Sequence, residues 1–303
     1  MDNTEYFENT SSFDFLGGSF KDYVIHNNAP ASIDALKQNM DSLSCDYVDY
    51  FVKASLDFPD IKLRSLFGPN KSISKYYYPQ WLKEDVTKTI SLDPPVGGHG
   101  LALLSDRARE YVLGKSFFDL GAYDGGSVLV LEKYQPYIVY SFEISPKNEQ
   151  LYQAKSSEFR CRYRFFRMAA GKSKGSFTFN DIGTSGTTLF RDYDAPNKTS
   201  VDVVTLDDFV AEFHTSETQP GFIKMDIEGS AYDATLGAFD TICKHRPVMS
   251  IAIYHSPQEF FKVKPLIESW KLGYRFSIRM FALKYTTKPY MDTHLICCPE
   301  ELI

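Results

Sequence analysis

The chain has 303 residues, 43% of them hydrophobic and 24% charged, and a net charge of −6 at pH 7. This length and balance predict a folded protein with a substantial core, and they exclude disordered and fibrous classes. The acidic charge, with no basic block to offset it, argues against nucleic acid as the main partner.

The sequence also predicts the cellular location of the protein. It contains no apolar run of about 18 residues, the length of a membrane-spanning helix, so no span is predicted. Residues 1–5 lack the basic start and the apolar stretch of a signal peptide. The cysteines form no paired metal-ligand spacing: Cys45, Cys161, Cys243, Cys297 and Cys298. We therefore expect a cytoplasmic protein with reduced thiols.

Residues 1–100 have less regular patterns than the rest of the chain. Apolar spacings at 34–40 and 47–52 are compatible with helices, whereas 75–81 is aromatic and broken by a proline. Proline and glycine cluster at 93–100, which disfavours regular structure and marks a boundary. That stretch is either a linker or a loop that reaches over the active site. We expect residues 1–100 to form a helical cap that serves oligomerisation or substrate choice.

Residues 101–303 alternate between helical and strand-like patterns. A helix is predicted at 101–113, ahead of a first strand at 117–120. Further strands are predicted at 137–142, 163–168, 176–179, 201–205, 221–226, 247–254, 274–279 and 293–298. Helical patterns lie between the main ones, at 127–133, 146–155, 206–210, 231–238 and 257–270. Strands separated by helices indicate an α/β fold with a mainly parallel sheet and helices on both faces.

The turn after the first strand is the most informative stretch. Residues 116–128 run from apolar residues through Asp119 to Gly121, Gly125 and Gly126. Glycine lets a chain turn tightly and brings backbone N–H groups close to a ligand. The turn lacks the first glycine of the dinucleotide fingerprint, and Asp119 would repel a phosphate but suit a cationic amino-acid group. The pattern therefore favours S-adenosylmethionine over a nicotinamide cofactor.

Polar or small residues also follow the later strands. Glu143 lies about 20 residues after the glycine turn, the spacing at which an acid accepts hydrogen bonds from ribose hydroxyls. Ala169, Asp226 and His255 follow three further strands. Ligands of open α/β sheets bind outside the carboxyl ends of the strands, so these residues are expected to share one site. For Glu143 the alternative is a solvated acid at a strand end.

Five stretches resemble, in order, the motifs of the FkbM-type family of S-adenosylmethionine-dependent methyltransferases. They are 118–125, 141–146, 203–209, 222–229 with 236–238, and 246–248 with 253–255. The resemblance covers about residues 112–298. It implies a class I methyltransferase domain, Rossmann-like with a seven-stranded sheet, over residues 101–303. Two departures are Tyr123-Asp124 in the first motif and Ile144, where a proline is common.

The resemblance implies roles by position. Members of the family typically O-methylate hydroxyls, often those of sugars in bacterial surface glycans or of natural products. The turn would hold the methionine part of the donor, with Asp119, Gly121, Ala122, Tyr123, Gly125 and Ser127. Glu143 and Ile144 would hold the ribose, and Met168 and Ala169 the adenine edge, while Asp226 would lie beside the donor methyl group.

Methyl transfer to a hydroxyl needs a group that takes the proton. His255 is the first candidate, because an imidazole is near neutral at working pH, and Asp226 is the second. Lys224 and Glu228 could orient the acceptor. The alternative for His255 is a structural histidine, and the alternative for Lys224 and Glu228 is a solvated pair beside a turn. Four other histidines are expected to have structural or surface roles: His99, His214, His245 and His294.

Asp226, Glu228 and His255 also form a plausible set of oxygen and nitrogen ligands for Mg²⁺. Metal-free base catalysis is the preferred interpretation. The hydroxyl-rich stretch 183–188 is expected to line the acceptor side.

We therefore expect an S-adenosylmethionine-dependent O-methyltransferase acting on a hydroxyl of a sugar, as a nucleotide-sugar or surface glycan. One alternative with the same fold is a nicotinamide-dependent oxidoreductase. Another is a catalytically silent cofactor-binding scaffold that uses residues 1–100 for assembly. The sequence leaves open the acceptor, the methylated position and the oligomeric state.

Overall fold

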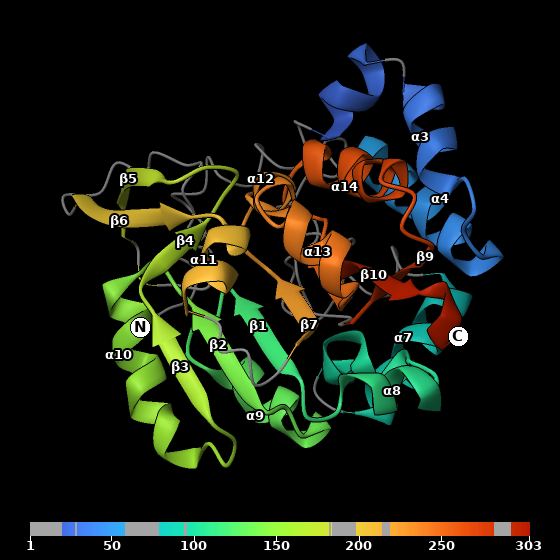
Figure 1. Ribbon diagram of the computed structural model, residues 1–303. Coiled ribbons are helices and arrows are strands. Elements are labelled where there is room, and N and C mark those ends of the chain that lie inside the picture. Colours follow the sequence, from blue (N-terminus) through green and yellow to red (C-terminus); the bar gives the residue numbers. More distant parts are fainter. Residues whose placement is uncertain are drawn as a thin grey trace, which may run out of the picture.

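The computed structural model describes residues 20–27, 29–57, 79–93, 96–181, 183, 198–213, 219–281 and 292–303. Its centre is a seven-stranded sheet with the strand order β3-β2-β1-β7-β8-β10-β9 (Figure 1). The strands are β1 (Ser116–Leu120), β2 (Ile138–Phe142), β3 (Tyr163–Phe166), β7 (Pro220–Met225), β8 (Val248–Ala252), β9 (Tyr274–Met280) and β10 (Thr293–Pro299).

The sheet is mixed rather than purely parallel. β3, β2, β1, β7 and β8 pair in parallel, whereas β10 pairs antiparallel with both β8 and β9. Every residue of β1, β2, β7 and β8 is buried, which explains their continuous apolar runs in the sequence. The predicted Rossmann-like α/β fold with a mainly parallel sheet is confirmed.

A second sheet of three strands lies beside the first, in the order β4-β6-β5. Its strands are β4 (Met168–Ala170), β5 (Gly175–Asn180) and β6 (Lys198–Val204). The strand predicted at 163–168 is therefore two strands, divided at Arg167. The first half pairs with β2 in the large sheet, and the second half pairs with β6 in the small one. The partner of the second half, β6, lies far along the chain, and this pairing decides where the strand divides.

Helices cover both faces of the large sheet. One face packs against α8 (Asp106–Val112), α9 (Gly126–Leu131) and α10 (Pro146–Lys155). The other packs against α11 (Leu206–Phe213), α12 (Ala231–Leu236), α13 (Phe239–His245) and α14 (Pro257–Ser269). Side-chain alternation along β1 links the layers, since Phe117 joins the first core and Phe118 the second.

The helix predicted at 101–113 is interrupted. Residues Gly97–Leu103 form a 3₁₀ helix, η2, and α8 begins only after Ser105. The break has a local cause, because the Ser105 hydroxyl accepts a hydrogen bond from the backbone N–H of Ala108 at 3.1 Å and so caps α8.

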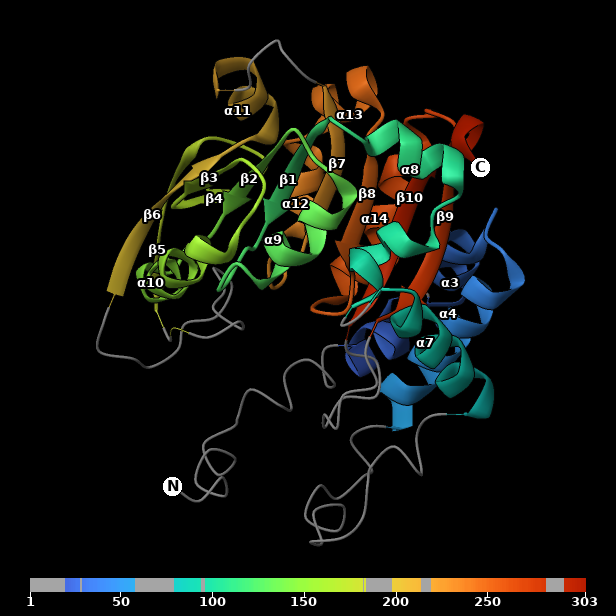
Figure 2. The same ribbon diagram turned by 90° about the horizontal axis from the view of Figure 1, so that it is seen from below.

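The described part of residues 1–96 is mostly helical. It contains a short helix at 20–26, then α3 (Ala29–Lys37), α4 (Ser42–Asp57) and α7 (Gln80–Leu92). Both views place these helices beside β9, at the end of the sheet opposite β4–β6 (Figures 1 and 2). Ser44 of α4 accepts a hydrogen bond from Ile278 N of β9 at 2.9 Å, and Met40 forms an isolated bridge with Phe276. The N-terminal helices therefore share the main core.

No helix among the described residues is long and apolar enough to cross a membrane. All five cysteines are free thiols, and Cys297 and Cys298 are buried in β10.

Candidate active site

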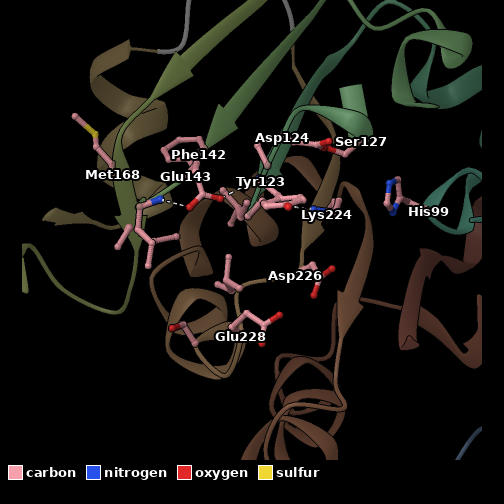
Figure 3. A pocket seen from close by; sticks show the side chains of 18 of the residues that line it. His99, Tyr123, Asp124, Ser127, Phe142, Glu143, Met168, Lys224, Asp226 and Glu228 are labelled. Carbon is pink, nitrogen blue, oxygen red and sulfur yellow. Dashed lines mark hydrogen bonds between the residues drawn. The ribbon is translucent and has the colours of Figure 1, made fainter. Parts of the chain in front are cut away.

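A pocket of about 260 Å³ lies at the carboxyl ends of β1, β2 and β7 (Figure 3). The turns after these three strands and residues of β4 form most of its wall. The lining residues are His99, Leu120–Asp124, Ser127, Phe142–Ile144, Met168–Ala170, Lys224, Asp226–Glu228, Ser230, Tyr254 and Asp292. The strand ends that the sequence singled out are therefore brought together. The predicted acceptor stretch 183–188 lies outside the described residues, except for Gly183.

The glycine turn packs directly on the end of β7. Gly121 has φ 86°, and a Cβ there would lie 2.0 Å from the carbonyl oxygen of Asp226. The N–H groups of Gly121 and Ala122 both donate to the carbonyl oxygen of Phe142 in β2, at 3.0 and 2.9 Å. Gly125 has φ 80° and sits against Phe159, so it does not line the pocket. These glycines are required by the packing of the turn itself.

Asp119 lies beneath the pocket rather than in its wall. It is fully buried, and Oδ1 accepts a hydrogen bond from Lys224 Nζ at 2.8 Å. Its other oxygen accepts from the hydroxyl of Ser127, which does line the pocket. Lys224 also donates to the carbonyl oxygen of Gly121 at 2.8 Å. Burial alone would lower the pKa of Lys224, but the carboxylates of Asp119 and Asp226 outweigh it and raise that pKa.

Glu143 connects the end of β2 to the glycine turn. Oε1 accepts from the N–H groups of Ile144 and Ser145, both at 2.9 Å, and from the Asn148 amide at 3.3 Å. Oε2 accepts from the N–H of Tyr123 at 2.9 Å, as Figure 3 shows. Burial raises the pKa of Glu143, and these hydrogen bonds oppose that rise.

The departure from the family motif, Tyr123-Asp124, has a structural role in this chain. Tyr123 takes a left-handed conformation with φ 47°, which directs its N–H to Glu143. Asp124 accepts from the N–H of Gly126 at 2.9 Å and pairs with Lys155 of α10. Both residues line the pocket. The pair fixes the turn between β1 and α9.

At the other side of the pocket, Asp226 and Glu228 follow β7, and His255 follows β8. The imidazole Nε2 lies 3.4 Å from Asp226 Oδ1 and 3.5 Å from Glu228 Oε1. Its Nδ1 lies 3.5 Å from Oε2 of Glu259, a fully buried carboxylate on α14. The His255 side chain is only 4% exposed and stands behind Asp226 and Glu228, outside the pocket wall.

The charges around His255 shift two pKa values in opposite directions. Burial would lower the pKa of His255, but Glu228 and Glu259 outweigh it and hold that pKa well above its usual range. Burial would raise the pKa of Asp226, but His255 and Lys224 outweigh it and lower that pKa. An imidazole in this setting carries a proton at neutral pH.

Comparison with known proteins identifies the family. The sequence matches the methyltransferase FkbM domain over residues 119–276, more than half of the chain. The chain belongs to the FkbM methyltransferase family. No curated protein matches the sequence at a significant level.

Three solved structures are similar to this FkbM-domain chain. The methyltransferase FkbM of Methylobacillus flagellatus KT has 19% identity and a TM-score of 0.59, and the match covers 92% of this chain but only 60% of that one. An rRNA methylase from Streptococcus thermophilus has 12% identity and a TM-score of 0.36, covering 63% of this chain and 90% of that one. TrmK of M. capricolum, in complex with S-adenosylhomocysteine, has 10% identity and a TM-score of 0.33, covering 64% and 67%.

The pocket extends beyond the matched FkbM domain. His99 precedes the match and Asp292 follows it, yet both line the pocket. His99 was expected to have a structural or surface role, and the structure adds that it lines the pocket, so residues 93–100 contain a segment that reaches this pocket. His245 ends α13, His294 is buried in β10, and His214 lies outside the described residues.

His99 is held in an unusual backbone conformation. Its φ is 51°, between Gly98 at 60° and Gly100 at 90°. A Cβ on Gly98 would lie 2.2 Å from the Tyr134 hydroxyl, and one on Gly100 would lie 2.5 Å from a methyl carbon of Ile296. Burial, with Lys224 and His294 nearby, holds the pKa of His99 well below its usual range, so its imidazole is neutral. The Gly-Gly-His-Gly run was the sequence signal for this turn.

Proposed function

We propose that this FkbM-family protein is an S-adenosylmethionine-dependent O-methyltransferase that acts on a hydroxyl of a sugar, as a nucleotide-sugar or a surface glycan precursor. One observation carries the proposal. Glu143 after β2 and the carboxylates of Asp226 and Glu228 after β7 face a single pocket beside the glycine turn (Figure 3). One set suits the ribose of the donor, and the other suits the hydroxyl of an acceptor.

The donor side fits a nucleoside. Among the described residues, Oε2 of Glu143 accepts only from Tyr123, so it keeps a lone pair for a ribose hydroxyl. Phe142, Met168 and Ala169 give an apolar wall next to it for the adenine. The N–H groups of Gly121–Tyr123 already donate to Phe142 and Glu143, so the carbonyl oxygens of this turn would hold the cationic amino group of the methionine part. When bound, S-adenosylmethionine supplies a methyl group activated by its sulfonium.

The acceptor side offers oxygen atoms that can hold a hydroxyl. Asp226 lines the pocket with a side chain that is 30% exposed, but its Oδ1 is buried beside His255, so the oxygen left for an acceptor is Oδ2. We assign it the task of accepting the hydroxyl proton as the oxygen attacks. Glu228 would orient the acceptor beside it. His255 was predicted to take the proton, but it carries a proton and stands behind both carboxylates, so we now assign it a positioning role.

Lys224 and residues 1–100 complete the proposal. Lys224 would support the turn through Asp119 and the Gly121 carbonyl oxygen rather than contact the acceptor. We keep the division into a methyltransferase domain at 101–303 and a segment at 1–100 that helps to select the acceptor. His99 supports that role, because it brings the second segment to the pocket wall.

The test measures binding and transfer separately. Calorimetry should show binding of S-adenosylmethionine and S-adenosylhomocysteine, and no binding of NAD or NADP. Incubation with S-adenosylmethionine carrying a deuterated methyl group and a panel of nucleotide-sugars and glycans should add one labelled methyl to a sugar. We expect Asp226→Asn to keep donor binding and to lower kcat by 10²-fold or more.

Other outcomes would overturn the proposal. Binding of NAD(P) without binding of S-adenosylmethionine would favour the oxidoreductase. Donor binding without transfer to any hydroxyl on the panel would favour the silent scaffold. Labelling of a nitrogen or carbon atom would keep the methyltransferase but reject the sugar hydroxyl as acceptor.

A further inference from the structure

Three side chains at the ends of β7 and β8 converge on one point beside the pocket. One ligand atom from each of Asp226, Glu228 and His255 lies within 4.8 Å of the other two. The His255 side chain is 4% exposed, while those of Asp226 and Glu228 are 30% and 25% exposed and line the pocket. The point is therefore closed on the histidine side and open toward the pocket.

The contacts of His255 are too long for hydrogen bonds. Its Nε2 lies 3.4 Å from Asp226 Oδ1 and 3.5 Å from Glu228 Oε1, whereas N–H···O bonds measure about 2.7–3.2 Å. Among the described residues, neither ring nitrogen nor Asp226 Oδ1 has a hydrogen-bond partner. Ligand atoms that surround a cation tetrahedrally at about 2.1 Å lie roughly 3.4 Å apart. The two distances from Nε2 to the carboxylate oxygens match that separation.

A fourth residue orients the imidazole. Glu259 is fully buried, and its Oε1 accepts from the N–H of Ala231 at 2.9 Å. Its Oε2 faces His255 Nδ1 at 3.5 Å and has no hydrogen-bond partner in the part of the chain that the structure describes. A histidine that binds a metal commonly directs its other ring N–H to a carboxylate, which fixes the tautomer. With Nδ1–H turned to Glu259, Nε2 faces the two carboxylates, and a cation bound there would replace the proton that Nε2 carries in the metal-free protein.

We propose that Asp226, Glu228 and His255 bind a first-row divalent cation through Oδ1, Oε1 and Nε2. Two carboxylates balance the charge of such an ion and suit Mn²⁺, and the imidazole adds a nitrogen ligand typical of first-row transition metals. The remaining coordination positions face the pocket, because Asp226 and Glu228 form part of its wall. If the proposed function is correct, the ion polarises the acceptor hydroxyl and makes its proton easier to remove.

The binding test uses the full-length protein stripped with a chelator and then titrated with Mn²⁺. Free Mn²⁺ is followed by electron paramagnetic resonance, and calorimetry gives Kd and stoichiometry. We expect one bound ion per chain and a higher Tm with the metal. Asp226→Asn and Glu228→Gln should each weaken binding by 10-fold or more. Asp292→Asn, which changes another pocket carboxylate, is the matched control and should leave Kd unchanged.

The remaining variants separate binding from folding. His255→Ala should abolish binding, and its Tm without metal shows whether the chain still folds. Glu259→Gln should weaken binding by about 10–100-fold as a positioning residue. Failure of the wild-type protein to bind Mn²⁺ at millimolar concentration, or the same Kd in Asp226→Asn and Glu228→Gln, would overturn the site and leave a buried ion-pair cluster.

Transfer assays with and without chelator keep the two proposals apart. Metal binding without methyl transfer to any hydroxyl would support the cation site and reject the proposed function. Full transfer in the chelated protein, with no Mn²⁺ binding, would reject the site and support the function.

Discussion

Lys224 shows how a single buried charge supports this pocket. The side chain is 3% exposed, yet it reaches across from β7 to the Asp119 carboxylate of β1 and to the carbonyl oxygen of Gly121 in the turn that follows. Asp119 in turn holds the Ser127 hydroxyl. Lys224 thus joins two neighbouring strands at the point where the glycine turn begins. The contribution of Lys224 to the free energy of unfolding is best measured together with that of Asp119.

We expect Lys224→Met to lower the free energy of unfolding by about 3–5 kcal/mol, because it leaves the Asp119 carboxylate buried without its cation. Chemical denaturation measures this loss. The double variant Lys224→Met/Asp119→Leu removes both charges and should recover a large part of it. If the double variant is no more stable than the single one, the pair does not act as a unit.

Glu143→Gln tests the link between β2 and the glycine turn. A glutamine amide group cannot accept hydrogen bonds at both ends, so one of the N–H groups of Tyr123 and Ile144 would lose its acceptor. We expect affinity for S-adenosylhomocysteine to fall by at least 10-fold, as measured by calorimetry. Glu149→Gln, at an exposed pair with Arg167, is the control and should bind normally. Equal affinity in both variants would count against the ribose role of Glu143.

The turn after β1 and the end of β7 are joined by direct contacts. The Asp226 N–H donates to the Leu120 carbonyl oxygen at 3.0 Å, and Gly121 fits beneath the Asp226 carbonyl group. A side chain at 121 would therefore push the turn away from the end of β7. The same contact places Asp226 relative to the turn.

Two glycine substitutions separate strain from crowding. Gly121 and Gly114 both have positive φ, at 86° and 67°, but only Gly121 has neighbours where a Cβ would stand. Gly114→Ala should cost about 1–2 kcal/mol from backbone strain alone. Gly121→Ala should cost more by at least about 1–3 kcal/mol, because β7 must move. Denaturant midpoints compare the two, and equal losses would show that the Gly121 contact can relax.

The sequence predicted the helices and strands better than it predicted which distant residues pack against them. The buried strands and the residues after them could be predicted, because parallel strands give apolar runs and their carboxyl ends meet at one edge. The position of His99 could not, since its turn depends on Tyr134 and Ile296, which are distant in sequence. The change of Asp119 from a ligand contact to a buried support depends likewise on Lys224, 105 residues away.

Buried histidines make the free energy of unfolding of this protein depend on pH. His294 is buried in β10, with its Nδ1 3.2 Å from the Ser250 hydroxyl. Burial lowers its pKa to about 4, Lys224 and His255 lower it too, and Asp226 opposes them. The unfolded chain therefore binds a proton at this residue first as the pH falls.

We expect the free energy of unfolding, without added metal, to fall as the pH drops from about 6.5 to 4. The His294 share approaches about 3 kcal/mol, since each unit of pKa shift corresponds to about 1.4 kcal/mol. His294→Phe should flatten the dependence in that window, as measured by denaturation at a series of pH values. An unchanged slope would assign the acid sensitivity to other groups, His99 among them, because its pKa is lowered in the same direction.

The contact between α4 and β9 has a consequence for self-association. β9 is the last strand of the large sheet, so its outer backbone groups could pair with a strand of another chain. Ser44 occupies the N–H of Ile278, and Met40 bridges to Phe276, so the N-terminal segment covers part of that border. The N-terminal segment that contains His99 therefore also covers part of the β9 edge, through α4 and Met40, and would limit edge-to-edge aggregation.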